Sequence, residues 1–385
     1  MSDSTIDTSP DVPDSAEEIV GQPFAGSGNL VAAYVDLLVP GVQIPADIYD
    51  ADVRRKLARA GTVLDISRIE AIFKLNDRRR TIYITKRTFI ELQKASLKFD
   101  VVPRKENEEF TGYTNCKDAT SVLLTEFSVT KTAPLETTKE VGGRISERLN
   151  NIPPSTVVEL INALAPVDEY LERHCVNVGM LNGLMGKWLS LSQDEVDELV
   201  LIGLLHDCGK ALTPPRVLTA PRRLTDIETE VMKMHPIYTY DLLADFPEKV
   251  RFCAKSHHEK VRGGGYPDAM ADDDLPLAAR ITAISDIYDA LVSRRAYKAA
   301  KTPFVAMAIL DSMKWTDLDA SLVDLFFHNM AEQVVGKPVT MSDGRVGVVD
   351  HVDVNDPEFP VVELDHLVFK TNKNLYCDSM FTDED

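Results

Sequence analysis

Histidines that could bind metal ions are concentrated in one part of this chain. Five of its eight histidines fall between positions 174 and 258, one is followed directly by an aspartate, and another aspartate lies downstream. Five imidazoles and two carboxylates exceed what one divalent ion needs, so they predict a centre with two metal ions, which suits displacement at phosphorus. The predicted ligands are His174, His206, Asp207, His235, His257, His258 and Asp286.

The His206-Asp207 pair stands at the end of an apolar helical pattern and is followed by Gly209 and Lys210. Neighbouring residues on a helix diverge by about 100°, so both can serve metal ions only at a helix end, where the carboxylate of Asp207 would bridge two ions. Gly209 would let a ligand approach the backbone, and Lys210 would present a point charge to a phosphate oxygen. Asp207 and Lys210 are therefore the predicted catalytic residues.

A second cluster, His257-His258-Glu259, precedes a loop that contains three glycines, an aromatic residue and a proline. Neighbouring histidines can bind one ion only where the backbone bends, which again indicates a helix end or a loop. The glycine-rich loop is expected to cover a pocket, with Gly265-Tyr266-Pro267 near a ligand. Asp286 lies among apolar residues, where an unpaired carboxylate would be costly and a cation would remove that cost.

The bulk composition limits the functions that this chain can serve. Its 61 acidic residues outnumber 42 basic ones and give a net charge of −19, which argues against duplex nucleic acid but not against one small phosphate ligand. The five cysteines are scattered without a CxxC pair, as in reduced cytosolic proteins. The N-terminus does not resemble a signal peptide, and no apolar run approaches the ~20 residues that span a bilayer. We therefore expect a soluble, cytoplasmic protein.

Changes in sequence pattern divide the chain into five parts. Residues 1–24 are acidic and contain Ser and Pro, which predicts a disordered tail. A small α+β regulatory or interaction domain is expected at 25–103, a connector with some helix at 104–154, long amphipathic helices at 155–333 and a β-rich segment at 334–385.

Local signals predict individual elements within these parts. Short strands are expected at 34–41 and 81–84, and a short helix at Arg54–Ala60 that Gly61 would end. Ser192 and Glu195 have the spacing of a capping box before a helix that runs to Leu205. Asp343-Gly344 predicts a hairpin turn. His328, His351 and His366 lack polar neighbours of the right kind and are expected to be ordinary surface or core residues.

Taken together, the motifs resemble the HD-GYP family of metal-dependent phosphohydrolases over about residues 168–300. The matching motifs are His206-Asp207 with Gly209-Lys210, His257-His258-Glu259, Gly265-Tyr266-Pro267, and the stretches 224–236 and 286–293. Several ordered motifs are far more specific than any one alone. The resemblance implies a mainly α fold: an all-helical catalytic domain, with a small α+β N-terminal domain and a short β-rich C-terminal segment.

The resemblance also implies a ligand set for each metal ion. One ion would be held by His174, His206, Asp207 and Asp286, and the other by Asp207, His235, His257 and His258. Family members with a third ion carry a glutamate four residues before the first histidine. That position is Tyr170 here, so two ions are expected, and the family favours iron or manganese among the metals that such ligands suit.

Further residues acquire roles from the same resemblance. Lys210, Arg295 and Lys298 match positions that contact phosphates, although the last two could instead be solvated surface charges. Tyr266 would lie near the substrate, or merely pack the glycine-rich loop. Glu259 and Asp289 are interpreted as side chains that orient metal ligands, with a helix-end charge and an ordinary helix cap as their alternatives.

The implied activity is hydrolysis of the bacterial second messenger cyclic di-GMP to the linear dinucleotide pGpG and then GMP, by a hydroxide that bridges the metal ions and attacks phosphorus. Arg262 and the 293–298 segment depart from the family pattern. These departures leave open a weakly active receptor or protein-interaction module. A general HD-type nucleotide phosphohydrolase is a further alternative, against which Gly265-Tyr266-Pro267 argues. The expected partners are cyclic di-GMP and, through the N-terminal domain, a second copy or a signalling protein; neither duplex nucleic acid nor membrane insertion is expected.

Overall fold

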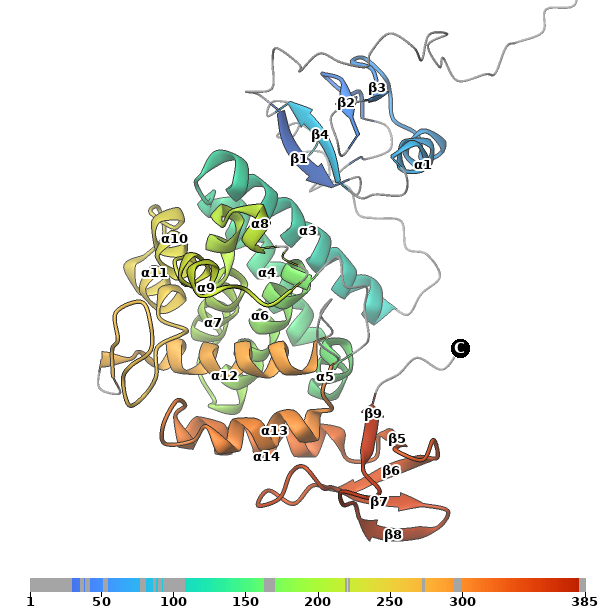
Figure 1. Cartoon of the computed structure of the whole chain (residues 1–385), viewed down its shortest axis with the longest axis vertical. Helices are drawn as coiled ribbons and strands as arrows, with labels where there is room; N and C mark the ends of the chain where they lie inside the picture. The colour runs from blue at the N-terminus through green and yellow to red at the C-terminus, as the bar shows by residue number, and fades with distance from the viewer. Residues whose placement is uncertain are drawn as a thin grey trace, which may run out of the picture. The chain divides into compact units, whose positions relative to one another are not determined.

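The computed structural model describes residues 30–34, 38, 42–50, 55–76, 81–85, 88, 92, 108–162, 170–218, 220, 222–271, 274–293 and 300–380. The chain divides into two compact units, Met1–Phe99 and Asp100–Asp385. The expected disordered tail at 1–24 lies outside the described residues, as does most of the strand expected at 34–41. The mainly α fold with a small α+β N-terminal unit and a β-rich C-terminal segment is confirmed (Figure 1).

The N-terminal unit contains a four-stranded antiparallel sheet and a helix. The strands are β1 (Leu30–Tyr34), β2 (Ile48–Tyr49), β3 (Lys56–Ala58) and β4 (Thr81–Thr85), in the order β1-β4-β2-β3. Helix α1 (Ile66–Leu75) begins where the side chain of Asp65 accepts a hydrogen bond from the Arg68 backbone N–H. The strand expected at 81–84 is confirmed by β4.

The helix expected at Arg54–Ala60 is wrong, because β3 occupies this stretch and pairs with β2. Leu57 is buried while Lys56 is exposed, and burial on alternate residues is the period of a strand. Gly61 follows in a turn, where its backbone N–H donates to the Ile44 carbonyl at 2.7 Å. Glycine therefore marked the end of a strand here and not the end of a helix.

The second unit is a bundle of helices followed by a sheet (Figure 1). Among its described residues, no helix is both long enough and apolar enough to cross a bilayer. The helices are α3 (Glu108–Thr130), α4 (Leu135–Asn151), α5 (Pro154–Asn162), α6 (Tyr170–Trp188), α7 (Gln193–Leu205), the 3-10 helix η4 (Cys208–Leu212), α8 (Pro215–Leu218), α9 (Asp226–Met232), α10 (His235–Leu242), α11 (Glu248–Lys255), α12 (Leu277–Val292), α13 (Pro303–Ser312) and α14 (Ala320–Val334).

Helices α3 and α4 occupy much of the region interpreted as a connector at 104–154, and both pack against α6. In α4, Val141, Ile145 and Leu149 are buried at a spacing of four residues, which makes one apolar face. In α3 the buried positions include Thr120, so its buried side is partly polar. Because both helices contain many polar residues, their sequences do not reveal that they pack against the bundle.

Helices α6 and α7 pack closely and form the support of the histidine region. The capping box at the start of α7 is confirmed, because Ser192 and the side chain of Glu195 satisfy each other's backbone groups. Helix α7 ends at Leu205 as expected. Asn182 of α6 donates to the Leu199 carbonyl at 3.1 Å and to the Thr282 hydroxyl of α12 at 2.9 Å, so buried polar contacts join α6 to both neighbours.

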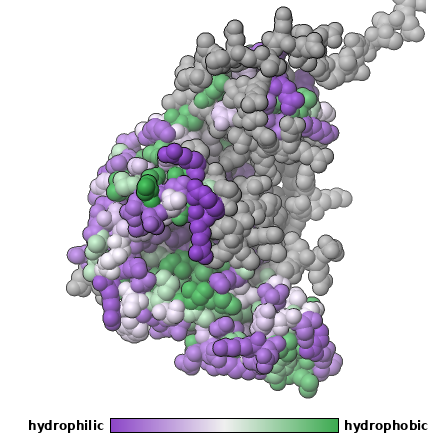
Figure 2. Space-filling model, viewed as in Figure 1, coloured by the Kyte–Doolittle hydropathy of each residue, from purple (hydrophilic) through white to green (hydrophobic). Residues whose placement is uncertain are grey.

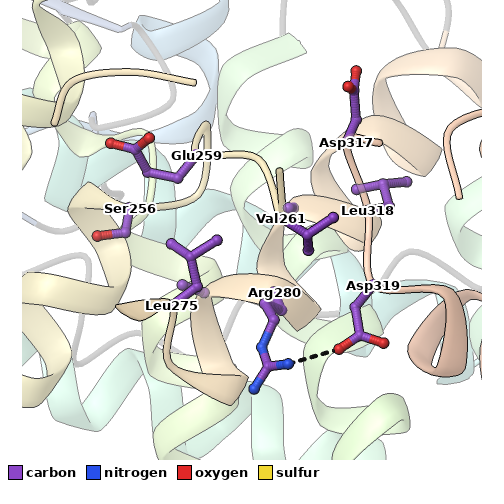
Figure 3. A pocket seen from close by; sticks show the side chains of 10 residues that line it. Ser256, Glu259, Val261, Leu275, Arg280, Asp317, Leu318 and Asp319 are labelled. Carbon is purple, nitrogen blue, oxygen red and sulfur yellow. Dashed lines mark hydrogen bonds and ion pairs between the residues drawn. The ribbon is translucent and has the colours of Figure 1, made fainter. Parts of the chain in front are cut away.

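A further ion pair joins α12 to the start of α14. The guanidinium of Arg280 lies 2.8 Å from the Asp319 carboxylate, and both residues line a small pocket (Figure 3). The other oxygen of Asp319 accepts from the backbone N–H groups of Ser321 and Leu322. Asp319 is therefore both the N-cap of α14 and an anchor for α12.

The C-terminal segment is an antiparallel five-stranded sheet. Its strands are β5 (Pro338–Met341), β6 (Val346–His351), β7 (Val361–Leu364), β8 (Leu367–Lys370) and β9 (Cys377–Met380), in the order β8-β7-β6-β5-β9. The hairpin predicted at Asp343-Gly344 is confirmed between β5 and β6. An ion pair between Lys337 and Glu159 ties the sheet to α5. Hydrophobic residues are exposed at the outer end of this sheet (Figure 2), where β8 presents Leu367 and Val368.

Candidate metal centre

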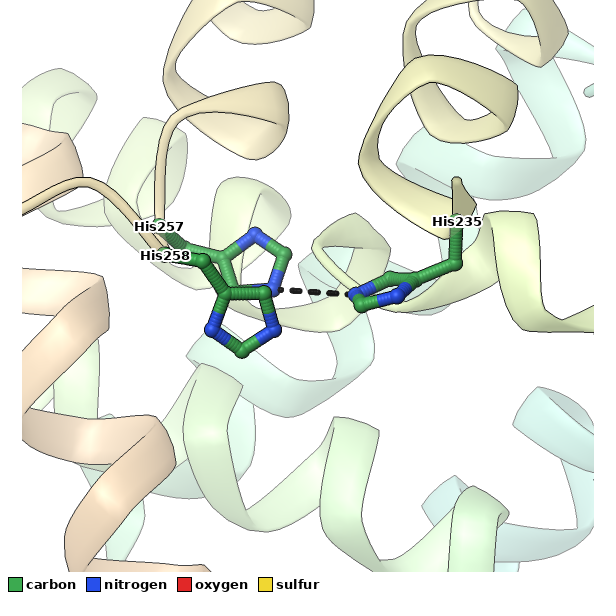
Figure 4. A group of neighbouring side chains, drawn as sticks. All are labelled: His235, His257 and His258. Atoms are coloured by element: carbon green, nitrogen blue, oxygen red, sulfur yellow. Dashed lines mark hydrogen bonds between the residues drawn. The ribbon is translucent and has the colours of Figure 1, made fainter. Parts of the chain in front are cut away.

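All seven predicted metal ligands converge in one buried region of the helical bundle. They arrive from helix ends and helix faces: His174 from α6, His206 and Asp207 from the junction of α7 and η4, His235 from the start of α10, His257 and His258 from the turn after α11, and Asp286 from α12. Three groups have ligand atoms that all lie within 4.8 Å of one another: His235, His257 and His258; His174, His206 and Asp286; and His206, Asp207 and His257. Figure 4 shows the first of these groups.

The backbone fixes the tautomer of three of these histidines. In each, Nδ1 lies 2.7 or 2.8 Å from the carbonyl oxygen three residues earlier in the chain, and the three rings are His206, His235 and His257. A carbonyl oxygen only accepts, so Nδ1 must donate and Nε2 of the neutral ring keeps its lone pair. The helix ends therefore aim three Nε2 lone pairs into the centre.

Each of these three Nε2 atoms lies close to another imidazole nitrogen. His206 Nε2 lies 3.2 Å from His174 Nε2, and His235 Nε2 lies 3.4 Å from His257 Nε2 (Figure 4). The Nε2 atoms of His235 and His257 both carry lone pairs, and they repel each other unless a positive centre lies between them. A divalent cation fits this donor set, because neutral imidazoles and carboxylates are its usual ligands.

Asp207 lies between the two pairs of histidines. Its Oδ1 is 3.1 Å from His235 Nε2 and 3.8 Å from His257 Nε2, while its Oδ2 is 3.3 Å from His174 Nε2 and 3.4 Å from His206 Nε2. The Oδ1 atom is fully buried and accepts no hydrogen bond within the described residues. Each oxygen thus faces a different histidine pair, which is the arrangement of a carboxylate that can bridge two ions.

Asp286 completes one side of the centre. Its Oδ1 is 3.0 Å from His174 Nε2 and 3.9 Å from His206 Nε2, and its Oδ2 is 3.8 Å from His258 Nδ1. Burial alone would raise the pKa of Asp286, but its hydrogen bond with His174 and the nearby imidazoles hold that pKa well below its usual value. The carboxylate therefore stays ionised, as a metal ligand must.

The remaining histidines with shifted pKa values fall into two groups: His257 and His258 are held neutral, as metal ligands must be, whereas His174 holds a proton that a metal ion would have to displace. Burial lowers the pKa of His258 to about 3, and burial with neighbouring imidazoles holds the pKa of His257 well below the usual value. Burial would likewise lower the pKa of His174, but the carboxylates of Asp207 and Asp286, with Asp289, raise it well above 6.5. A proton on His174 offsets there the negative charge that a metal ion would otherwise neutralise.

Lys210 and Gly209 differ in what they contribute. The Lys210 ammonium group contacts Asp207 Oδ2, so this lysine lies at the centre as predicted. A Cβ atom on Gly209 would lie 2.1 Å from the His235 carbonyl oxygen and 2.5 Å from the Thr239 backbone nitrogen. Gly209 therefore permits the backbone of α10, and not a ligand as expected, to approach η4.

The Gly265-Tyr266-Pro267 loop packs directly on the histidine turn. A Cβ on Gly265 would lie 2.5 Å from Glu259 Cα and 2.6 Å from the His258 carbonyl oxygen. The Tyr266 ring stacks on His258 with a centroid distance of 4.6 Å, and the Tyr266-Pro267 peptide is cis. Tyr266 therefore closes one side of the centre.

Glu259 holds the Gly265-Tyr266-Pro267 loop, and its hydrogen bonds do not run to a histidine as interpreted from the sequence. Its carboxylate accepts from the backbone N–H groups of Asp268 at 2.6 Å and Met270 at 3.0 Å. Asp289, by contrast, lies directly behind a predicted ligand, because its Oδ2 is 2.7 Å from His174 Nδ1. The sequence did not indicate Asn177, which also donates to Asp289, although it lies one helical turn from His174 on α6.

The other residues singled out from the sequence lie away from the centre or outside the described residues. Arg295 and Lys298 lie outside the described residues, and Tyr170 begins α6. His328 on α14 is paired with Glu332 at an exposed site. The remaining two histidines belong to the C-terminal segment, where His351 lies on β6 and His366 precedes β8. Lys233, which belongs to the 224–236 stretch and was given no role from the sequence, holds its ammonium group 5.9 Å from the centre of the Tyr266 ring.

Comparisons with known proteins agree with this architecture. The family model of the HD domain matches residues 159–322. The cyclic di-GMP phosphodiesterase response regulator RpfG of Xanthomonas campestris pv. campestris is 40% identical over 172 residues, which cover 43% of this chain and 45% of that protein. The cyclic di-GMP phosphodiesterase PA4108 of Pseudomonas aeruginosa is 34% identical over 201 residues, covering 51% of this chain and 48% of that protein. The chain thus spans about half the length of these relatives.

A solved structure supports the fold. Bd1817, an HDG"Y"P protein from Bdellovibrio bacteriovorus, has a TM-score of 0.55 with 17% sequence identity, covering 78% of this chain and 99% of that chain. Residues 159–322 are therefore an HD domain, and its histidines and aspartates form groups that could hold metal ions. Within this matched region, the His257-His258-Glu259 and Gly265-Tyr266-Pro267 motifs pack against each other.

Proposed function

We propose that this protein is a phosphodiesterase that hydrolyses cyclic di-GMP to pGpG, to GMP, or to both in turn. The observation that carries the proposal is the Asp207 carboxylate, whose two oxygens face separate histidine pairs. The printed names of RpfG and PA4108, both cyclic di-GMP phosphodiesterases, support the substrate.

The proposed metal centre contains two ions, with iron or manganese as the expected metals. One ion is assigned to His174, His206, Asp207 and Asp286, and the other to Asp207, His235, His257 and His258. When bound, such ions polarise a phosphate oxygen and activate a water for attack at phosphorus. Asp207 belongs to both sets, so its loss should empty both.

The chain's own residues supply the rest of the chemistry. Lys210 holds its ammonium group at Asp207 Oδ2, where it can neutralise charge that develops on a phosphate oxygen. Tyr266, backed by His258, forms a ring face at the edge of the centre, and Glu259 keeps its loop in place. Arg295 and Lys298 are proposed as further phosphate contacts on the resemblance alone.

The proposal also covers the location of the protein in the cell and its binding partners. All five cysteines are free and buried, which supports a reducing, cytoplasmic location. The N-terminal unit folds as a separate compact body, and this separation supports its use as the place where a second copy or a signalling protein binds.

The test uses the full chain purified without oxygen and loaded with Mn²⁺ or Fe²⁺. Cyclic di-GMP, cyclic GMP-AMP and simple nucleotides are followed by chromatography, together with metal content. Asp207→Asn should lose bound metal and lower turnover at least about 100-fold, because two ions share this ligand. Asp350→Asn, a change at an exposed carboxylate of β6, is the matched control and should retain both.

The outcomes separate the competing functions. Turnover of cyclic di-GMP that disappears in Asp207→Asn supports the proposal. Tight binding of cyclic di-GMP by the metal-loaded wild type without any hydrolysis would make the protein a receptor. Retained activity in Asp207→Asn would refute the assignment of the centre itself.

A further inference from the structure

A chain of buried hydrogen bonds runs from α3 to the candidate metal centre. The Tyr113 hydroxyl donates to Asn177 Oδ1 at 2.6 Å, and Asn177 Nδ2 donates to Asp289 Oδ1 at 2.6 Å. Asp289 Oδ2 then accepts from His174 Nδ1 at 2.7 Å. All four side chains belong to buried residues, with exposed fractions of 4% or less. Water is therefore kept away from every link of this chain.

The direction of each hydrogen bond in this chain is determined. Arg173 also bonds to the Tyr113 hydroxyl, and a guanidinium can only donate. At the other end of the chain, the Asp289 carboxylate can only accept, so the Asn177 amide N–H₂ faces Asp289 and Asn177 Oδ1 accepts the proton of the Tyr113 hydroxyl. This fixes Asn177 Oδ1 toward Tyr113 and leaves its amide N–H₂ for Asp289. The reverse orientation of the amide would place its oxygen against the Asp289 carboxylate, so Asp289 sets the direction of the amide and Tyr113 holds it there by donating to its oxygen.

The orientation of Asn177 in turn decides how Asp289 meets His174. Asp289 Oδ1 receives the Asn177 amide and the Ser293 hydroxyl, the latter at 3.2 Å. Its Oδ2 is thereby left to accept the Nδ1 proton of His174, which aims His174 Nε2 at Asp207 and Asp286. A carboxylate behind a metal-binding histidine fixes the ring and raises its basicity.

We propose that Tyr113 is a positioning residue for the metal ion assigned to His174, His206 and Asp286. The inference rests on the proposed metal centre and adds to it a residue of α3, a helix that precedes the matched HD domain at 159–322. Tyr113 touches neither metal nor substrate; it acts through Asn177 and Asp289.

The expected effect follows from the number of links. Changing a side chain that orients a metal ligand directly lowers metal affinity by about 10- to 100-fold. Tyr113 lies two hydrogen bonds further from the metal, and its loss removes one hydrogen bond. We therefore expect the affinity for the ion at the His174 site to fall by about 3- to 10-fold. The ion assigned to His235, His257 and His258 should keep its affinity.

The experiment compares two buried tyrosines in the full chain. Tyr113→Phe removes the hydroxyl of the hydrogen-bond chain, while Tyr288→Phe removes a buried hydroxyl that accepts from Asn162 Nδ2 at 3.5 Å and is not a link of that chain. Mn²⁺ affinities at both sites are measured by competition with a chelator, and phosphodiesterase activity is measured at limiting and at saturating Mn²⁺. Tyr113→Phe should weaken one site and regain activity with excess Mn²⁺, and Tyr288→Phe should do neither.

A second variant tests whether Tyr113 acts through Asn177. Asn177→Leu removes the amide, so adding Tyr113→Phe to it should weaken Mn²⁺ binding no further, since coupled residues do not add. Additive losses, or wild-type affinity at both sites in Tyr113→Phe, would overturn the inference while a metal-loaded, active wild type keeps the proposed function. A wild-type chain that binds no Mn²⁺ would overturn both.

Discussion

Gly209→Ala should damage both the stability of the helical bundle and its metal centre. The added Cβ would lie 2.1 Å from the His235 carbonyl oxygen and 2.5 Å from the Thr239 backbone nitrogen, whereas ordinary contact begins at 3.4 Å. The two opposing atoms belong to the backbone of α10, so neither can rotate away. Helix α10 and η4 would have to part by about 1 Å to accept the methyl group.

The size of the effect can be worked from this displacement. Overpacking a well-packed interior costs about 1–3 kcal/mol, and the upper value applies here because backbone atoms are opposed. About 3 kcal/mol corresponds to a fall in Tm of roughly 5–10 °C for a unit of this size. The same movement carries His235 away from Asp207 Oδ1, now 3.1 Å distant. A shift of about 1 Å at a catalytic centre lowers turnover about 100-fold.

The assay combines thermal unfolding with metal content and turnover of cyclic di-GMP. The matched control is Gly143→Ala on the exposed face of α4, where no atom lies within 4 Å of the added Cβ. Alanine favours a helix over glycine by about 0.5–1 kcal/mol, so this control should melt at or above the wild-type temperature. A Gly209→Ala protein with wild-type Tm and full metal content would refute the close backbone approach of α10 and η4.

Three further perturbations follow from the same contacts. Glu259→Gln should weaken the two backbone hydrogen bonds that hold the Tyr266 loop, raising KM about tenfold with unchanged metal content in parallel kinetic and metal assays. Asp319→Ala removes the N-cap of α14 and should lower the free energy of unfolding in urea by about 1 kcal/mol without changing kcat. The folded state lowers the pKa of Asp319. The stability difference between wild type and variant should therefore be complete above pH 4 and shrink as the pH falls further. Chelation should lower Tm, and Mn²⁺ at 100 times its Kd should restore about 2.7 kcal/mol, so a Tm indifferent to chelator would count against a resident ion.

The sequence predicted best where chemistry restricts the choice of residue. Few side chains besides histidine and aspartate can ligate a divalent ion, so the predicted ligands could be identified one by one, and all of them converge in the structure. The capping box of α7 and the hairpin at Asp343-Gly344 were predictable for a similar reason, because their backbone geometry requires particular residues. That these seven side chains bind metal stays a prediction.

The sequence predicted poorly where distant contacts decide the outcome. The Arg54–Ala60 stretch contains good helix formers, yet pairing with β2 makes its centre a strand. Glu259 follows two histidines in sequence, but its partners are backbone groups nine and eleven residues further on. Gly209 carries no sign in the sequence of which backbone comes near it. In each case the deciding neighbour lies beyond the three- or four-residue spacing of a helix, so local sequence patterns do not reveal it.

The hydrogen bonds around Asp289 also show why the functional domain extends beyond its motifs. A buried carboxylate must be satisfied on both oxygens, since leaving it unpaired would be very costly. The motif region supplies His174, Asn177 and Ser293 as donors. Asn177 then has a carbonyl oxygen of its own to satisfy, and the donor comes from Tyr113 on α3. The hydrogen bond from Tyr113 therefore joins α3 to the motif region, although α3 begins at Glu108 and the motifs begin only at about residue 168.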